Sequence, residues 1–294
     1  MKKFAFYLLG KKGYRCLNRF LEEYGGKAVA FVVLARDRGV KNDYFDEISS
    51  LCRQHAVNLY DRSENVPNNF DVSFAIGWRW LIPDSYRLIV FHDSLLPKYR
   101  GFAPLVNMLI NGEKKIGVTA LYASLSYDAG HIIERQSIQI TYPLKISEAI
   151  DRVADLYELA LLRIAGRIVS GEELQGTPQD KTEATFSLWR DESDYQINWE
   201  SGADELKRFV DAVGYPYSGA KTQLHGKSIR ILDVDIVKDV KVESRNAHIG
   251  KVIFMDNGCP TVICGTGLIK LLNVIDENGD SLIGRLPFRT RFGA

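Results

Sequence analysis

One run in this sequence, residues 88–101, has the composition of a chemical site. Residues 88–91 form a short apolar run that is typical of a buried strand, and His92 stands where that strand should end. Ligands of open α/β sheets gather beyond the carboxyl ends of strands, so His92 is placed where chemistry usually occurs. A lone histidine is more often an interior residue with satisfied hydrogen bonds, so other residues must decide between the two interpretations.

Two further polar residues, Asp128 and His131, follow a later apolar run and could meet His92 at the same edge of the sheet. A carboxylate orients a nearby imidazole, and the pair can move a proton near neutral pH. When an amine attacks a carbonyl carbon, one group must take the amine proton and another must stabilise the oxyanion. His92 and Asp128 could share these tasks, and no serine or cysteine in a recognisable nucleophile elbow competes with them.

The elements that would position these side chains alternate between strands and helices. Short apolar runs predict strands, and apolar residues at intervals of three and four predict helices. We expect strands over residues 4–9, 29–34, 57–60, 72–76, 88–92, 117–122 and 132–140, helices over 14–24, 44–55 and 103–111, a turn at 10–13, and a long helix capped by Ser147. This order predicts βαβ units in a doubly wound, Rossmann-like, mostly parallel α/β sheet that is covered on both faces.

The second part of the chain has a different pattern. Residues 171–182 are polar, contain Gly and Pro, and predict a linker. Beyond it we expect one helix, 203–213, and short strands over 219–222, 228–237, 250–254, 260–264 and 268–274. This pattern predicts a β-rich, barrel-like domain. We therefore predict an α/β domain over residues 1–182 and a β-barrel-like domain over residues 183–294.

The composition limits the classes of protein to consider. Lys and Arg number 38 and Asp and Glu number 37, so the net charge of +1 argues against broad capture of nucleic acid. The four cysteines lack CxxC spacing and clustered histidines, which indicates reduced thiols in a cytoplasmic protein and no metal site. The apolar run after Lys3 is too short for a signal peptide, and no run reaches the length of a membrane span.

Three blocks of the sequence carry a resemblance to a known family. They are His92-Asp93-Ser94-Leu95-Leu96-Pro97-Lys98-Tyr99-Arg100-Gly101, then Gly117-Val118-Thr119, then Asp128-Ala129-Gly130. In this order and separation they resemble the folate-dependent formyltransferases, which act on methionyl-tRNA, glycinamide ribonucleotide or sugar nucleotides. A further resemblance, to the start of that family's OB-like C-terminal domain, lies in Trp189-Arg190, Ile197-Asn198-Trp199 and Pro216-Tyr217-Ser218-Gly219-Ala220.

The resemblance implies roles for individual residues. His92 matches the catalytic histidine, and Asp128 matches the aspartate that orients it and assists proton transfer. The pteridine of the co-substrate 10-formyltetrahydrofolate would be enclosed by Trp80, Leu81, Ile82, Leu88, Leu125, Ser126 and Tyr127. The first three belong to residues 77–83, where two tryptophans could form a wall for a planar ligand.

One position departs from the family. Val90 stands where members place an asparagine, two residues before the histidine, to position the formyl group and stabilise the oxyanion. Valine has no donor, and losing one oxyanion donor typically lowers the rate on the order of 10²–10³-fold. Either protonated His92, a water or another amide such as Asn107 takes over, or the chain is a weakened folate- or nucleotide-binding homologue.

The resemblance favours a nucleotide-linked amino sugar as the acceptor. Members that act on methionyl-tRNA are expected to carry a basic insertion after the second strand, whereas residues 36–43 are few and mixed in sign. The diphosphate could lie near Arg100, or near Lys12 at a helix N-terminus, although Lys12 could equally be a solvated turn lysine. Methionyl-tRNA is the alternative acceptor, and a homodimer and the role of the second domain stay open.

Overall fold

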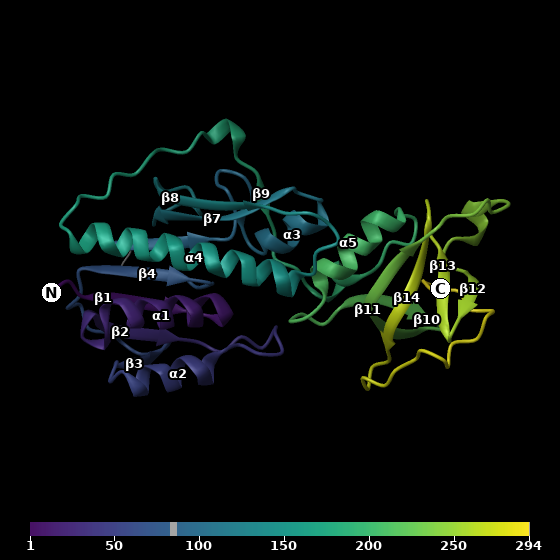
Figure 1. Ribbon diagram of the computed structural model, residues 1–294, viewed down its shortest axis with the longest axis horizontal. Coiled ribbons are helices and arrows are strands. Elements are labelled where there is room, and N and C mark those ends of the chain that lie inside the picture. The colour runs from purple at the N-terminus through teal and green to yellow at the C-terminus, as the bar shows by residue number, and fades with distance from the viewer. Residues whose placement is uncertain (83–86, 294) are drawn as a thin grey trace. The chain divides into compact units, whose positions relative to one another are not determined.

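Strand β1 (Phe4–Leu8) is an interior strand of a seven-stranded sheet in a computed structural model of the chain (Figure 1). The structure describes residues 1–82 and 87–293, so Pro83, the last residue of the predicted ligand wall at 77–83, lies outside the described residues. The chain forms two units, and each is described by itself. The first comprises Met1–Leu105, Lys114–Ile140 and Ala149–Trp189.

The sheet of the first unit has the strand order β3-β2-β1-β4-β5-β7-β8. Besides β1, its strands are β2 (Val29–Leu34), β3 (Leu59–Asp61), β4 (Val72–Ile76), β5 (Leu88–His92), β7 (Lys115–Tyr122) and β8 (Ile132–Gln139). The five strands from β3 to β5 are parallel, and β7 and β8 join as antiparallel strands. The predicted mostly parallel sheet is therefore confirmed, and β5 ends at the edge where such sheets bind ligands.

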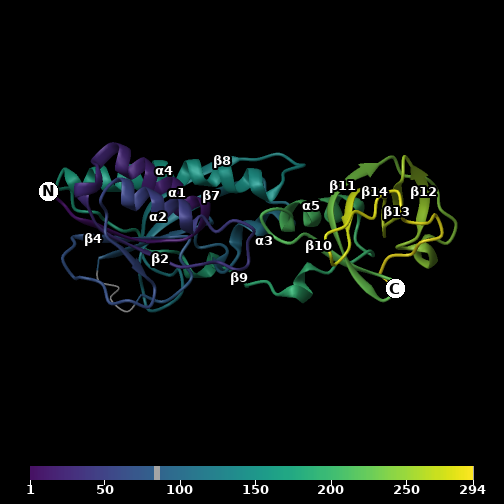
Figure 2. The same ribbon diagram turned by 90° about the horizontal axis from the view of Figure 1, so that it is seen from below.

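Helices cover one face of this sheet. They are α1 (Gly10–Tyr24), α2 (Phe45–Gln54) and α4 (Ile146–Val169), and Figure 2 shows them along the same side. The side chains of Phe4 and Phe6 in β1 pack edge-on against Phe20 of α1, and Phe91 of β5 packs against Tyr157 of α4. Because side chains alternate along a strand, the residues between these phenylalanines must face the other way.

Loop segments cover the opposite face. A buried cluster there consists of Ala5, Tyr7, Phe31, Val33, Ala75 and Leu88. Phe70, Trp78 and Ile82, all outside the strands, pack against it. Both faces are covered, as predicted, but the second face is covered by loops and not by helices. The alternation places Val90 and His92 on this loop-covered face.

Two local predictions are wrong. Residues 10–13 are not a turn, because α1 begins at Gly10 and only Leu9 separates it from β1. Gly10 has a φ of +68°, a conformation that only glycine adopts readily, and this allows the chain to change direction without extra residues. Helix α4 begins at Ile146, so Ser147 lies inside the first turn and does not precede it as a cap.

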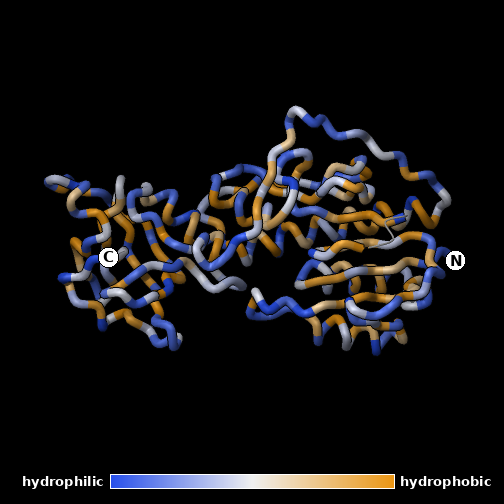
Figure 3. The backbone as a smooth tube through the Cα atoms, turned by 180° about the vertical axis from the view of Figure 1, so that it is seen from behind, coloured by the Kyte–Doolittle hydropathy of each residue, from blue (hydrophilic) through white to orange (hydrophobic). Residues whose placement is uncertain are grey.

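The segment predicted as a linker makes regular contacts with the sheet. Figure 3 shows the stretch after α4 mostly in the blue and white of hydrophilic residues. Thr177 and Ile132 exchange two backbone hydrogen bonds of 2.8 Å. Strand β9 (Phe186–Ser187) then pairs in parallel with β6 (Arg100–Gly101), and η2 (Lys181–Glu183) lies between these contacts in sequence. We call residues 177–187 the strap, because both of its ends are bonded to segments that carry predicted site residues.

The second unit comprises Val106–Glu113, Thr141–Glu148 and Arg190–Ala294. Its antiparallel sheet has the order β10-β11-β14-β13-β12. Its strands are β10 (Ala220–Leu224), β11 (Lys227–Val237), β12 (Val252–Asp256), β13 (Cys259–Ile263) and β14 (Leu268–Ile275). The remaining helices of the described chain are η1 (Gly26–Ala28), α3 (Pro104–Ile110), η3 (Glu192–Tyr195), α5 (Ala203–Val213) and η4 (Arg245–His248). The β-rich second part is thus confirmed, while the domain limits of 1–182 and 183–294 stay a prediction.

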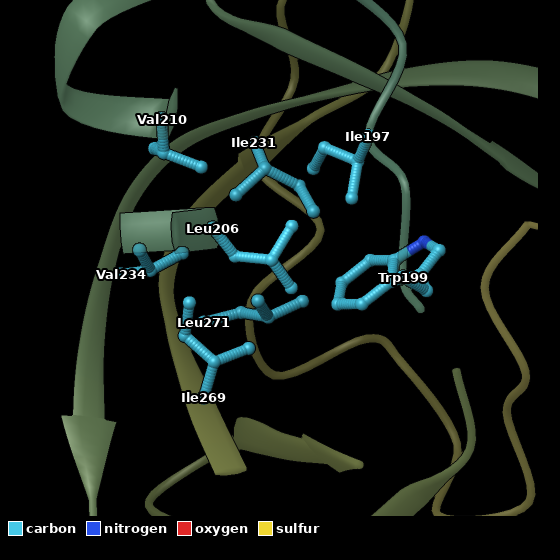
Figure 4. A pocket seen from close by; sticks show the side chains of 8 residues that line it. All are labelled: Ile197, Trp199, Leu206, Val210, Ile231, Val234, Ile269 and Leu271. Carbon is cyan, nitrogen blue, oxygen red and sulfur yellow. The ribbon is translucent and has the colours of Figure 1, made fainter. Parts of the chain in front are cut away.

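Apolar side chains from α5 and the sheet form the core of the second unit. Figure 4 shows a small void lined by Ile197, Trp199, Leu206, Val210, Ile231, Val234, Ile269 and Leu271. The indole nitrogen of Trp199 is the one polar side-chain group in this lining, and it donates to Thr222 Oγ1 at 3.0 Å. Since that donor is satisfied within the protein, the void is part of the packing of α5 on the sheet and offers a ligand no polar contact.

Candidate active site

His92 is the last residue of β5, and only 7% of its surface is exposed. Its Nε2 lies 2.7 Å from the carbonyl oxygen of Tyr99. A carbonyl oxygen can only accept, so Nε2 carries a hydrogen and donates it. This bond leaves Nδ1 as the ring nitrogen that can take up a further proton.

Asp128 faces that second nitrogen. Its Oδ2 lies 3.5 Å from His92 Nδ1 and accepts a hydrogen bond of 2.8 Å from the backbone N–H of Gly101. Gly101 has a φ of +99°, and a Cβ at this position would lie 2.6 Å from the carbonyl oxygen of Ser187, so the contact requires glycine. A proton taken up at Nδ1 would face the carboxylate, which is the arrangement a general base needs.

Buried hydrogen bonds hold the loop after His92. Thr119 Oγ1 donates to the carbonyl of Ser94 at 2.7 Å and accepts from the N–H of Leu96 at 3.1 Å. The hydroxyl of Ser94 donates to the carbonyl of Lys98 at 2.7 Å. The residues of the first two sequence blocks are therefore in contact, and their contacts fix the position of His92 before any substrate binds.

A charged cluster lies behind His92, and the sequence did not reveal it. Asp93 accepts from the ammonium of Lys12 and from the hydroxyl of Tyr157, which is almost fully buried in α4. Burial opposes the charge on Asp93, but the charge of Lys12 and the hydrogen bonds outweigh it and hold the pKa of that carboxyl below its ordinary value. Burial and the neighbouring Asp93 raise the pKa of Tyr157, so its hydroxyl stays protonated and donates.

The two cations predicted to bind a diphosphate are both engaged within the protein. Lys12 lies in the first turn of α1, and its side chain is 16% exposed beside Asp93. Arg100 is buried, and its guanidinium donates to Gln179 Oε1 from Nε at 3.2 Å and from Nη2 at 2.7 Å. A diphosphate at either place would have to compete with these partners.

The residues predicted to enclose the pteridine are partly exposed and partly packed in the core. Trp80 packs edge-on against Trp78, and Leu81 is 84% exposed. Ile82 packs on the core cluster, to which the buried side chain of Leu88 belongs. In the loop with Ser126, the side chain of Leu125 is fully exposed and that of Tyr127 is 64% exposed. Exposed apolar side chains therefore lie on both segments, while the side chain of Leu88 is buried and its carbonyl oxygen accepts from the N–H of Ala123 at 3.0 Å.

Asn107, the amide predicted to replace the missing asparagine, is engaged by another side chain. The partly buried side chain of Val90 packs on the buried Leu96 and Leu121 and provides no donor. Asn107 accepts from Arg190 through Nε at 3.2 Å and Nη2 at 2.6 Å, and both residues belong to the second unit. His131 is exposed directly before β8, whereas His92 and Asp128 face each other.

Within residues 1–82 and 87–293, no group of three or more His, Cys, Asp or Glu side chains is arranged to hold a metal ion. Over the same described ranges, no helix combines the length and the apolar character that crossing a bilayer requires.

Two parts of the chain match models of one protein family. Residues 75–164, which include His92 and Asp128, match the formyl transferase family, and residues 191–289 match the formyl transferase C-terminal domain. The chain therefore belongs to the formyltransferase family. It is 30% identical over 183 residues to the methionyl-tRNA formyltransferase of Syntrophomonas wolfei, a match covering 62% of this chain and 57% of that protein. It is 29% identical over 222 residues to that of Alkaliphilus oremlandii, covering 73% and 69%.

Solved structures share the fold at low sequence identity. An N-formyltransferase from Helicobacter canadensis aligns with a TM-score of 0.70 at 15% identity, covering 92% of this chain and 99% of that one. HypX from Aquifex aeolicus aligns with a TM-score of 0.66 at 17% identity over 96% of this chain, but this chain spans only 45% of HypX. At these identities the likeness concerns the fold alone.

Proposed function

We propose that this protein transfers the formyl group of 10-formyltetrahydrofolate to the amine of a nucleotide-linked amino sugar. The observation that carries the proposal is the His92–Asp128 pair, which stands at the carboxyl end of β5 inside the residues that match the family. We place the reaction in the cytoplasm, because Cys16, Cys52, Cys259 and Cys264 are free thiols.

The reaction moves one formyl group and one proton. A bond forms between the acceptor nitrogen and the formyl carbon, the bond from that carbon to the folate nitrogen breaks, and the acceptor's proton passes to the leaving nitrogen. In our proposal His92 accepts the proton at Nδ1 and later returns it, while Asp128 stabilises the imidazolium in between. Proton transfer by a positioned side chain of this kind contributes about 10²–10⁴-fold to a rate.

Residues 77–82 support a site for the folate co-substrate. The Nε1 of Trp78 is buried and has no hydrogen-bond partner among the described residues, and the neighbouring Leu81 exposes apolar surface. An unsatisfied buried donor is costly unless a ligand or water pairs with it. The structures of related folds include HypX in complex with tetrahydrofolic acid and the Helicobacter enzyme with folinic acid and dTDP-3-aminofucose.

Ion pairs in the segment after β2 support a small acceptor over tRNA. Arg36 pairs with Asp43 at 3.2 Å and with Asp46 at 2.7 Å, and Arg79 pairs with Asp37 at 2.5 Å. Binding a phosphate backbone requires cations that are free to replace counterions. Arg36 and Arg79 are instead paired with carboxylates of the same protein.

Product analysis tests the proposal. The protein is incubated with 10-formyltetrahydrofolate and a panel of amino sugars linked to thymidine, uridine or guanosine diphosphate, and each product is examined by mass spectrometry. We expect one panel member to gain the mass of one formyl group. Formylation of methionyl-tRNA with no product across the panel would overturn the choice of acceptor.

Methionyl-tRNA is the second candidate acceptor, because the curated relatives that match the sequence are methionyl-tRNA formyltransferases. Those matches cover between 56% and 69% of the relatives. A direct comparison of turnover on charged tRNA and on the sugar panel separates the two candidates.

A further inference from the structure

We propose that Gln179 is the positioning residue for the catalytic pair: its side-chain amide joins the loop that carries Asp128 to the loop that follows His92. The proposal rests on the proposed function for its catalytic meaning. Its structural content, the placement of Asp128 against His92, is independent of which substrate binds.

Both the nitrogen and the oxygen of the Gln179 side-chain amide form hydrogen bonds. Nε2 donates to the carbonyl oxygens of Asp128 at 2.7 Å and Gly130 at 2.8 Å. Oε1 accepts from Arg100 Nε at 3.2 Å and Nη2 at 2.7 Å. A guanidinium only donates and a carbonyl only accepts, so the partners themselves determine which end of the amide is oxygen. One neutral side chain therefore holds two loops through four hydrogen bonds.

Asp128 needs such a restraint because its backbone conformation is unusual. Its φ is +49°, in the left-handed region that residues with a side chain seldom occupy. A conformation of this kind persists at functional sites only when the surroundings determine it from several sides. Gln179 holds the carbonyl of Asp128, and the N–H of Gly101 holds its carboxylate.

The backbone on either side of Asp128 leaves little freedom of its own. A Cβ on Gly130 would lie 1.8 Å from the carbonyl oxygen of Tyr122, so this loop passes very close to β7. Gly130 is also the second residue to which Gln179 donates. The amide thus holds the loop at Asp128 itself and again two residues after it.

The strap is hydrogen-bonded on both sides of Gln179, and this fixes the position of its backbone. Two residues before it, Thr177 is bonded to Ile132, and beyond it the hydroxyl of Thr185 accepts from the N–H of Tyr99 at 2.8 Å. Tyr99 provides the carbonyl that binds His92 Nε2. The strap therefore contacts the catalytic histidine's own partner, and Gln179 adds the contact to the aspartate.

A purely structural role makes a different prediction from a positioning role. If Gln179 only stabilises the loops, its loss lowers thermal stability but leaves the environment of His92 unchanged. If it positions Asp128, its loss moves the carboxylate away from Nδ1, and the environment of the His92 imidazole changes. Other groups contribute to that environment: Asp93 beside His92, and behind it Lys12 from α1 and Tyr157 from α4.

Gln179→Met tests the proposal, because methionine is similar in length but neither donates nor accepts strongly. Gln175→Met, an exposed glutamine in the same segment, is the matched control. The five histidines are followed by NMR titration of the imidazole signals, and the signals of His92 are identified by their loss in His92→Ala. Turnover is measured on the same proteins.

We expect the imidazole signals of His92 to change in Gln179→Met in the same way as in Asp128→Asn, and to stay unchanged in Gln175→Met. We expect kcat to fall about tenfold with little change in KM. In an Asp128→Asn background the same change at Gln179 should add almost nothing to either effect.

Full additivity with Asp128→Asn, or a His92 titration like that of the wild type, would overturn the positioning role. If Gln179→Met does not fold, Gln179→Asn replaces it: this side chain keeps the amide but is one methylene too short to bridge both loops. A wild-type protein that forms no product would overturn the proposed function, while the His92 titration would still decide the role of Gln179.

Discussion

Removing Lys12, the cation paired with Asp93 beside His92, gives the sharpest test of the site's electrostatics. In Lys12→Met the carboxylate of Asp93 loses its ion pair but stays at a place where only 17% of its side chain is exposed. Breaking a buried pair by removing one partner typically destabilises a protein by about 3–5 kcal/mol. Because both side chains keep some contact with solvent, we expect the lower end, about 3 kcal/mol at pH 7.

The pH dependence of this loss follows from the pKa of Asp93. In the wild type that pKa is lowered, so the carboxylate stabilises the fold above its unfolded pKa, and the contribution disappears as the pH falls below about 4. Without Lys12, burial is left as the main influence and should raise the pKa of Asp93. The variant can then protonate Asp93 in mildly acidic solution, so its deficit relative to the wild type should shrink as the pH is lowered from 7 towards 4.

Urea unfolding at several pH values measures this deficit, with Asp93→Asn and the double variant completing a mutant cycle. We expect the double variant to be more stable than Lys12→Met at pH 7, because no uncompensated charge is then buried. A Lys12→Met protein as stable as the wild type at pH 7 would refute the reasoning. If that protein instead showed a raised KM for a nucleotide sugar and unaltered stability, Lys12 would serve the diphosphate as the sequence predicted.

Four other substitutions test the site. His92→Ala and Asp128→Ala should each lower turnover about 10²–10⁴-fold while the far-UV circular dichroism spectrum stays the same; full activity in either variant would remove that residue from the mechanism. Val90→Asn should raise kcat, by up to about 10²-fold, if the wild type lacks an oxyanion donor, and a gain from no detectable activity would instead favour a binding homologue. Gly130→Ala should place a methyl group against the carbonyl of Tyr122, so urea unfolding should show a loss of about 2 kcal/mol or more, together with lower turnover; wild-type stability would contradict the close approach of this loop to β7.

The sequence was most informative where the signal was local. The strands predicted over 29–34, 72–76 and 88–92 coincide with β2, β4 and β5, because a short apolar run bounded by turn residues has few alternatives to a buried strand. The same local pattern correctly placed His92 at the end of a strand. The local pattern was misleading at residues 10–13. It suggested a four-residue turn, whereas Gly10 is already the first residue of helix α1.

Contacts between distant residues required the tertiary structure. Lys12 and Asp93 are 81 residues apart, and Gln179 is 51 residues from Asp128 and 79 from Arg100. No periodicity encodes such pairs, because a side chain's partner depends on which segments the sheet and the strap bring together. By itself the sequence determined the order of the elements, the family and the two residues that face each other in the site. Only the tertiary structure decided that a lysine predicted for the ligand is bound to a partly buried carboxylate, and that Gln179, predicted to lie in a linker, holds the carbonyl of Asp128.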